Sequence, residues 1–107
     1  MLYLWKEIKD NFADVVISGQ AFEHIEYFWL TMEEISRTLK PGGLICLIAP
    51  SAGPVHRCPV DCWRFYEDGF SALARYVGLS VLETFIDPVP GWKNCVLIAK
   101  KPLGDEL

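Results

Sequence analysis

The strongest constraint in this sequence is an uninterrupted run of six apolar residues, Leu44-Ile-Cys-Leu-Ile-Ala49. Apolar and polar side chains do not alternate along the run, which is typical of a strand covered on both faces. Pro41-Gly42-Gly43 comes directly before it, and this combination ends a helix and turns the chain. We therefore expect a buried central strand over residues 44–49, entered from a helix.

The remaining segments alternate between strand-like and helix-like patterns. Apolar periodicity predicts strands at 14–18, 81–86 and 94–100, and helices at 27–40 and 67–77. The first helix is expected to hold Lys40 at its C-terminal end, and Gly78 is expected to follow the end of the second. The order strand, helix, strand, helix, strand, strand predicts an α/β fold, in which a parallel sheet ends in an antiparallel strand pair.

Composition excludes several classes of protein. A length of 107 residues fits one domain, and a hydrophobic content of 51% excludes a disordered chain. The net charge is −4 and the basic residues are scattered, so no basic stripe for nucleic acid is present. No apolar run approaches the roughly 18–20 residues needed to cross a bilayer. We expect a soluble, cytoplasmic protein with neither nucleic acid nor a membrane as a partner.

The four cysteines do not indicate a disulfide framework or a metal site. They are few and irregularly spaced, and Cys46 and Cys95 lie inside apolar runs. His56, Cys58 and Cys62 offer three metal ligands, but no Cys-x-x-Cys pair accompanies them. We therefore expect no metal.

Motifs in the first half of the chain occur at a recognisable spacing. They are Phe12-Ala-Asp-Val-Val-Ile-Ser18, then Glu23-His24, then Glu34-Ile-Ser-Arg-Thr-Leu-Lys-Pro-Gly-Gly43, then an apolar strand ending in Ala49-Pro50. This arrangement resembles the C-terminal half of a class I S-adenosylmethionine-dependent methyltransferase of the type 11 subgroup. The resemblance implies a Rossmann-like partial sheet, strands four to seven of that fold, in a single truncated domain over residues 1–107.

The same resemblance implies that most of the cofactor site is missing. The sequence contains no Gly-x-Gly, the turn whose amides approach the ligand, and no counterpart of the acidic residue that holds the ribose. What remains is one wall, in which Ser18, Gly19, Gln20 and Ala21 are expected beside the methionine part of S-adenosylmethionine. Glu23 and His24 are expected to orient this loop. The alternative is an ordinary strand-to-helix loop with a permissive glycine.

The loop at residues 50–66 is the second candidate site, because ligands of open α/β sheets bind beyond the carboxyl ends of strands. Its polar and aromatic residues resemble a pattern found in methyltransferases that modify glycans or small metabolites. They are His56, Arg57, Asp61, Trp63, Arg64 and Tyr66.

Two roles are open for these residues. His56 or Asp61 could act as the general base for a hydroxyl acceptor, with Arg57, Trp63, Arg64 and Tyr66 binding the substrate. Alternatively, Asp61 and Arg64 form a local ion pair that orders the loop, while Trp63 and Phe65 fill the core.

A partial sheet also predicts an interface. The first strand, Asp14–Ser18, lacks its neighbours, and an apolar strand edge is a template for pairing with another chain. We expect a homo-oligomer through this edge or through Met1–Trp5, or else a completing N-terminal half. Two functions follow. The chain is either part of a methyltransferase acting on a small molecule or glycan, inactive in isolation, or a non-catalytic oligomerisation or interaction module of methyltransferase descent.

Overall fold

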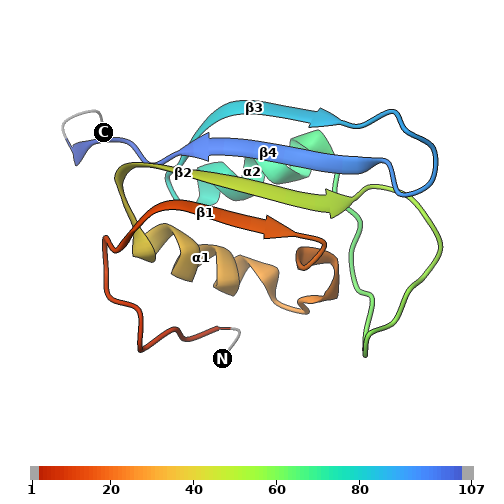
Figure 1. Ribbon diagram of the computed structural model, residues 1–107, viewed down its shortest axis with the longest axis horizontal. Helices are drawn as coiled ribbons and strands as arrows, with labels where there is room; N and C mark the ends of the chain where they lie inside the picture. Colours follow the sequence, from red (N-terminus) through yellow and green to blue (C-terminus); the bar gives the residue numbers. More distant parts are fainter. Residues whose placement is uncertain (1–2, 105–107) are drawn as a thin grey trace.

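Four strands form one mixed sheet in the computed structural model, which describes residues 3–104 (Figure 1). The elements in chain order are β1 (Ala13–Gly19), the short 3₁₀ helix η1 (Phe22–His24), α1 (Phe28–Thr38), β2 (Leu39–Pro50), α2 (Glu67–Tyr76), β3 (Ser80–Ile86) and β4 (Asn94–Lys100). The sheet order is β1-β2-β4-β3; β1 and β2 are parallel, and β4 is antiparallel to both of its neighbours. The predicted α/β fold with an antiparallel C-terminal pair is confirmed.

The junction between α1 and β2 differs from the sequence prediction. The helix ends at Thr38, so Lys40 lies in the strand rather than in a last helical turn. Pro41-Gly42-Gly43 is also part of β2. The pairing with β1 jumps from Ala13 opposite Leu39 to Val15 opposite Leu44, so the glycines form an irregular bulge instead of a separate turn.

Contacts from distant parts of the chain explain why α1 ends early. The Phe12 amide donates a hydrogen bond to the Thr38 carbonyl at 2.7 Å. Lys101 Nζ donates to the carbonyls of Ser36 and Leu39, each at 2.8 Å. These donors satisfy carbonyl groups that a helix end leaves without an intrahelical partner. Tertiary hydrogen bonds therefore set this boundary, and local sequence does not show them.

The end of α2 follows the prediction. Gly78 has a φ of +79°, the left-handed conformation that glycine adopts without strain. Its amide donates to the Arg75 carbonyl at 3.0 Å, and the Leu79 amide donates to the Ala74 carbonyl at 2.9 Å. This pair of bonds is a Schellman motif, so the predicted role of Gly78 is confirmed.

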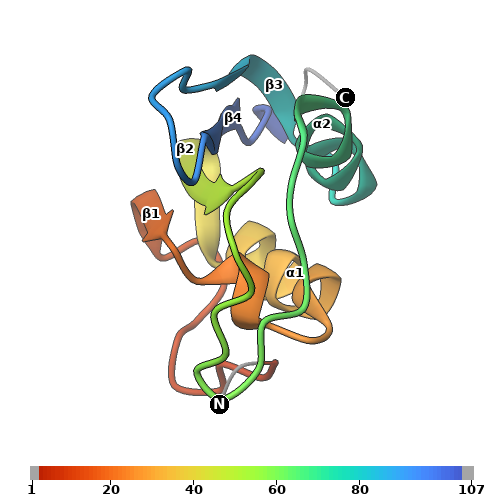
Figure 2. The same ribbon diagram turned by 90° about the vertical axis from the view of Figure 1, so that its right-hand side faces the viewer.

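The core lies between one face of the sheet and the two helices. Its largest fully buried side chains come from β2, β4, α1, α2 and η1, and include Ile45, Leu47, Leu97, Met32, Ile35, Phe70 and Phe22. Both helices lie on the same side of the sheet (Figure 2). The predicted apolar stripes of the two helices supply this layer.

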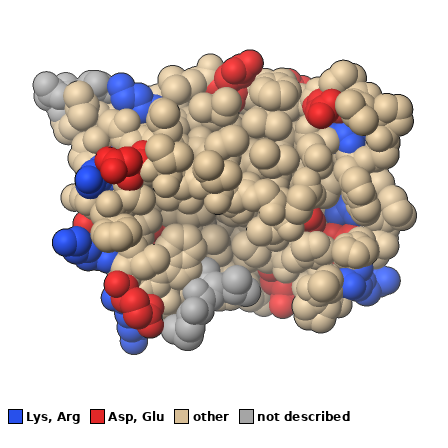
Figure 3. Space-filling view, viewed as in Figure 1, with Lys and Arg blue, Asp and Glu red and all other residues tan. Residues whose placement is uncertain are grey.

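The opposite face of the sheet is open, which contradicts the expectation that residues 44–49 are covered on both faces. The run alternates between buried and partly exposed positions, and Leu44 is exposed. Apolar side chains on both edge strands are also exposed: Val15, Ile17, Leu82 and Phe85. Figure 3 shows this face, with charged residues mainly toward its outline. An apolar run indicates that both faces favour burial, but the described residues supply helices for only one.

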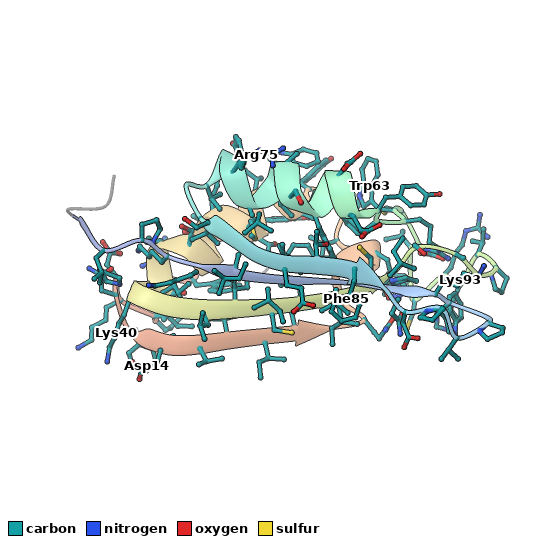
Figure 4. The ribbon with its side chains drawn as sticks, turned by 90° about the horizontal axis from the view of Figure 1, so that it is seen from above. Asp14, Lys40, Trp63, Arg75, Phe85 and Lys93 are labelled. Atoms are coloured by element: carbon teal, nitrogen blue, oxygen red, sulfur yellow. The ribbon has the colours of Figure 1, made fainter. Side chains whose placement is uncertain are left out.

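The two ends of the sheet carry different side chains. Figure 4 shows α2 on one side of the sheet, with Asp14 and Lys40 at one end and Trp63 and Lys93 at the other. Asp14 and Lys40 form an ion pair with a 3.4 Å separation. β1 and β2 both run toward the end of the sheet where Figure 4 labels Trp63 and Lys93. No helix within residues 3–104 is both long and apolar enough to span a membrane.

The central position of Leu47 gives a test of the core. Leu47 is fully buried on β2, so Leu47→Ala should lower the free energy of unfolding by about 2–5 kcal/mol through lost burial and the cavity left behind. Leu4→Ala is the matched control, because Leu4 is 52% exposed and the same change should cost less than about 0.5 kcal/mol. Urea unfolding followed by circular dichroism measures both. Equal effects would contradict this packing.

Candidate functional site

A cavity of about 420 Å³ lies at the carboxyl ends of β1 and β2. Three segments form it: the loop after β1, the loop 50–66 after β2, and the connection between β3 and β4. Its lining residues are Gln20, Glu23, His24, Pro50, His56, Asp61, Arg64 and Trp92. This is the edge where open α/β sheets bind ligands, because loops from neighbouring parallel strands converge there.

The two loops singled out from the sequence therefore meet at one cavity. Six of the candidate residues line it: Gln20, Glu23, His24, His56, Asp61 and Arg64. The others, Ser18, Gly19, Ala21, Arg57, Trp63 and Tyr66, lie outside its lining. Gly19 is the last residue of β1 and has open space beside its α-carbon, since no heavy atom lies within 4 Å of the position a Cβ would take.

Asp61 and Arg64 form a two-pronged ion pair. Arg64 Nη1 and Nη2 donate to the two carboxylate oxygens of Asp61 at 2.7 and 2.8 Å. The Asp61 carboxylate also accepts the His56 amide at 2.6 Å. Arg64, and then the His56 amide, hold the pKa of Asp61 well below its usual range. An anion so firmly held is a weak base, and the geometry is that of the ion pair considered as the alternative for these residues.

The Arg64 guanidinium also donates to two backbone carbonyls of the loop. Its Nε donates to the Ala52 carbonyl at 3.2 Å, and Nη2 donates to the Pro54 carbonyl at 2.8 Å. One side chain therefore holds both ends of the segment between residues 52 and 61. A planar guanidinium suits this role, because its donors point in fixed directions.

The aromatic residues of the loop divide between core and surface. Phe65 is buried and stacks on Phe70, with ring centroids 4.8 Å apart. Trp63 is 40% exposed, and its indole N–H donates to the Ile25 and Glu26 carbonyls, each at 3.1 Å. Phe65 thus fills the core as the alternative expected, whereas Trp63 attaches the loop to the segment before α1.

Glu23 and His24 lie in η1, a 3₁₀ helix that sequence periodicity did not reveal because it is only three residues long. His24 Nδ1 lies 2.6 Å from the Val60 carbonyl. The backbone carbonyl of Glu23 accepts the amides of Cys62 and Trp63 at 2.8 and 3.1 Å. These contacts join the loop after β1 to the loop after β2, and they fit an orienting role for η1.

Glu23 has a second feature that the sequence did not show. Its side chain is nearly inaccessible, and Glu23 as a whole is 4% exposed. Oε2 lies 3.6 Å from His24 Nε2, and Oε1 has no hydrogen-bond partner within the described part of the chain. A buried carboxylate oxygen that lacks a partner is costly, so Oε1 of Glu23 distinguishes this residue from the others that line the cavity.

Trp92, between β3 and β4, is the lining residue that lies outside both loops singled out from the sequence. Its ring makes an edge contact with His56 at a centroid distance of 6.3 Å, and the Arg64 guanidinium carbon lies 5.6 Å from its centroid. Gly53, with a φ of +95°, permits this placement, because a Cβ there would come within 2.2 Å of the indole. The sequence did contain a signal that could have found Trp92. It predicted β3 and β4 as an antiparallel pair, and the connection of such a pair lies at the edge where β3 ends.

The described residues contain no group of three metal-ligating side chains suitable for an ion. All four cysteines are free thiols, and Cys58 and Cys62 are exposed. His56 faces His24, with ring centroids 5.8 Å apart.

Comparison with protein families finds a match for the first part of the chain. Residues 5–47 match the model of a methyltransferase domain. Solved structures of S-adenosylmethionine-dependent methyltransferases share the fold of most of the chain. The resemblance to class I methyltransferases is confirmed. Comparison with curated protein sequences finds no significant match.

Three methyltransferase structures illustrate the likeness. The 1,6-didemethyltoxoflavin-N1-methyltransferase of Burkholderia thailandensis, with bound 1,6-didemethyltoxoflavin and S-adenosylhomocysteine, has a TM-score of 0.74 at 18% identity over 87% of this chain and 45% of that one. A methyltransferase from Methanosarcina mazei has a TM-score of 0.71 at 16% identity over 90% and 62%. A methyltransferase in complex with the Trm112 activator of Haloferax volcanii has a TM-score of 0.70 at 22% identity over 89% and 57%.

The chain thus spans about half the length of these methyltransferases, between 45% and 62%. The antiparallel pairing of β3 with β4 agrees with the antiparallel pair expected at the end of the sheet.

The Asp61–Arg64 pair predicts a pH dependence of loop order. A carboxyl group whose folded pKa is depressed stabilises the fold fully above its unfolded pKa of about 4, and that contribution is lost as the pH falls toward the lower folded pKa. Amide hydrogen exchange at residues 52–64 should therefore quicken below about pH 4 relative to the strands. Asp61→Asn should quicken it already at pH 7.

Asp68→Asn is the matched control for this variant, because Asp68 is exposed on α2. It should leave exchange in the 52–64 loop unchanged at pH 7. If Asp61→Asn behaved like this control, the ion pair would not order the loop.

Proposed function

We propose that this chain forms the acceptor side of an S-adenosylmethionine-dependent methyltransferase. The single observation that carries the proposal is the cavity at the carboxyl ends of β1 and β2, on a sheet with the methyltransferase fold. S-adenosylmethionine would supply the methyl group as a reactive sulfonium. The acceptor is a small molecule or a glycan, and the small-molecule ligand of the B. thailandensis enzyme supports the first.

The residues at the end of β1 fit one wall of a cofactor site. Gly19 leaves its flank open, and Gln20 adopts a φ of +57°, which turns the chain sharply after the strand. Gln20 Nε2 is fixed by donation to Asn94 Oδ1 at 2.9 Å. In the proposal Ser18, Gly19, Gln20 and Ala21 contact the methionine part, and the glycine-rich wall comes from a completing half.

The loop 50–66 would position the acceptor. Methyl transfer is an in-line displacement, so orientation supplies much of the rate. His56 lines the cavity and is the proposed base for a hydroxyl acceptor, since Asp61 is held as an anion by Arg64 and is the weaker candidate. Asp61 would instead hold His56 in place through the His56 amide.

Three exposed side chains beyond the cavity lining complete the proposed acceptor site. They are Arg57, Trp63 and Tyr66. The guanidinium of Arg57 suits a carboxylate or phosphate on the acceptor, and the two rings offer stacking surfaces.

The missing wall requires another polypeptide segment. The open edge of β1 suits backbone pairing with a strand, whether from a completing N-terminal half or from a second copy of this chain. The H. volcanii structure shows a methyltransferase together with an activator protein, which supports a role for a partner.

Binding of S-adenosylhomocysteine tests the cofactor wall. The chain alone presents only part of the site, so we expect affinity in the millimolar range. Titration of the ¹⁵N-labelled chain should shift the amide signals of residues 18–21 selectively. Gly19→Val should abolish these shifts, because its side chain enters the open space beside β1.

Gly69→Ala is the matched control, since Gly69 on α2 also has open space for a Cβ but lies away from the cavity. It should bind like the unmodified chain. Shifts confined to other regions, or none at millimolar ligand, would contradict the cofactor assignment.

The open face of the sheet favours a second function, that of an oligomerisation or interaction module. Exposed apolar side chains from both edge strands lie on this face, including Ile17 on β1 and Phe85 on β3. Contiguous apolar surface of this kind marks interfaces. A stable oligomer that does not bind S-adenosylhomocysteine would favour this function over catalysis.

The oligomeric state tests both partner proposals. Ile17 is 72% exposed on β1, so Ile17→Lys should lower the association constant at least tenfold by burying a charge in any interface along this edge. Val55→Lys, in the loop 50–66, is the control, because Val55 is also exposed but lies off the sheet. Light scattering coupled to gel filtration gives the masses. A monomer at micromolar concentration would exclude self-association and leave a completing half as the partner.

A further inference from the structure

We propose that Glu23 and His24 bind a protonated amine in the cavity, and that this amine is the methyl acceptor. The first part depends only on the geometry of η1 and the cavity. The second rests on the proposed function, with an amine in place of a hydroxyl acceptor and His24 in place of His56 as the group that takes the proton. The assignment extends the orienting role of Glu23 and His24 to direct contact with the ligand.

The first argument is the unbalanced carboxylate of Glu23. Glu23 lines the cavity, its side chain is 6% exposed, and its Oε1 lacks a hydrogen-bond partner within residues 3–104. Leaving a buried acceptor unpaired costs free energy, and an anion costs more than a neutral group. The negative charge of the carboxylate is shared by both oxygens. A cation in the cavity would therefore stabilise this buried charge.

The second argument is the hydrogen bonding of His24. A backbone carbonyl can only accept, so the 2.6 Å contact with Val60 requires that His24 Nδ1 carries a proton and donates it. In the neutral ring Nε2 is then an acceptor. It lies 3.6 Å from Glu23 Oε2, and two acceptors that face each other need a donor group nearby. An ammonium group has several N–H donors, so it can donate to His24 Nε2 and to Glu23 Oε2 at the same time.

The third argument is the charge balance of the other lining residues. Asp61 and Arg64 neutralise each other through two hydrogen bonds, and Gln20 is bonded to Asn94. No lysine lines the cavity. Arg64 also acts electrostatically on Glu23, but within residues 3–104 its hydrogen bonds to a carboxylate go to Asp61. Glu23 is therefore the lining carboxylate that no arginine or lysine of the described chain bonds, which favours a cationic ligand over an anionic one.

The other lining residues indicate what kind of group the amine is attached to. Pro50 and the indole of Trp92 give the cavity apolar surface beside the polar pair. A volume of about 420 Å³ is within the range of small-molecule sites. An amine attached to a flat apolar or aromatic group fits these walls.

The same pair can prepare the amine for reaction. The ammonium transfers one proton to the lone pair of His24 Nε2, which leaves a neutral amine and an imidazolium beside the Glu23 carboxylate. The nitrogen lone pair then forms a bond to the methyl carbon, and the carbon–sulfur bond breaks with its electron pair going to sulfur. The products are a methylated ammonium and S-adenosylhomocysteine.

The experiment compares benzylamine, protonated at pH 7, with benzyl alcohol, which has similar shape and no charge. Each is titrated into the ¹⁵N-labelled chain without cofactor, and backbone and imidazole ¹⁵N signals are followed. We expect benzylamine to bind at least tenfold more tightly than benzyl alcohol and to shift the His24 Nε2 signal. Equal affinities, or tighter binding of the alcohol, would overturn the proposal.

Glu23→Gln keeps the size of the side chain and removes its charge. It should weaken benzylamine binding at least tenfold, about 1.4 kcal/mol, and leave benzyl alcohol unchanged. Glu26→Gln, the same change on an exposed neighbour, should leave both affinities unchanged. If the two variants weakened benzylamine binding equally, a general effect of surface charge would explain the binding, and the proposed site would be wrong.

The imidazole spectrum of the ligand-free chain gives an independent readout at pH 7. A neutral His24 protonated on Nδ1 supports the proposal. A doubly protonated His24 would make it the counterion of Glu23 and overturn the proposal.

Failure of this inference is distinguishable from failure of the proposed function. If S-adenosylhomocysteine shifts residues 18–21 but benzylamine shows no preference, the amine site is wrong and the methyltransferase proposal stands. Selective benzylamine binding without any response to S-adenosylhomocysteine supports the amine site and overturns its role as methyl acceptor.

Discussion

The position of β2 inside the sheet is the constraint on which the rest of the structure depends. β2 is hydrogen-bonded on both sides, to β1 in parallel and to β4 in antiparallel orientation. Parallel pairing makes β1 and β2 end at the same edge, so their following loops emerge side by side (Figure 1). The antiparallel neighbour then brings the β3–β4 connection to that edge as well. The cavity is a geometric consequence of this pairing before any polar contact is considered.

Polar contacts convert these neighbouring loops into a defined wall. The loop 50–66 is long and has little regular structure, so its order depends on a few tertiary bonds. Arg64 gathers carbonyl and carboxylate groups of the loop itself, and η1 attaches the loop to the end of β1 through the Val60 carbonyl and the Glu23 carbonyl. Loss of one of these bonds loosens the others, since they share the same short segment.

Much of the fold could be predicted from the sequence, because helical stripes and apolar runs are local signals. The stripe through Met32 and Ile35 and the glycine after α2 correspond directly to buried positions and to a helix end. The early end of α1 could not be read, because its donors, Phe12 and Lys101, are distant along the chain or outside any periodic pattern. The open face of the sheet could not be predicted for a related reason. An apolar run such as 44–49 indicates that its side chains favour burial, but it does not show which elements cover each face.

The candidate site shows the same division. The sequence placed the two loops at one edge, and six of the candidate residues line the cavity. It gave no sign of the buried, partly unpaired carboxylate of Glu23 or of the part played by Trp92, because both depend on side chains from different segments meeting. Residue type and spacing indicate which groups are available, and tertiary contacts determine which of them are satisfied.

The strand order also has a consequence for how this sheet assembles during synthesis. β4 is made after β3 but lies between β3 and β2. Until residues 94–100 leave the ribosome, β3 has no partner in the sheet, and one side of β2 exposes its backbone amides and carbonyls to water. Residues 94–100 must therefore be made before β3 can join the sheet, and their arrival completes the hydrophobic layer between sheet and helices.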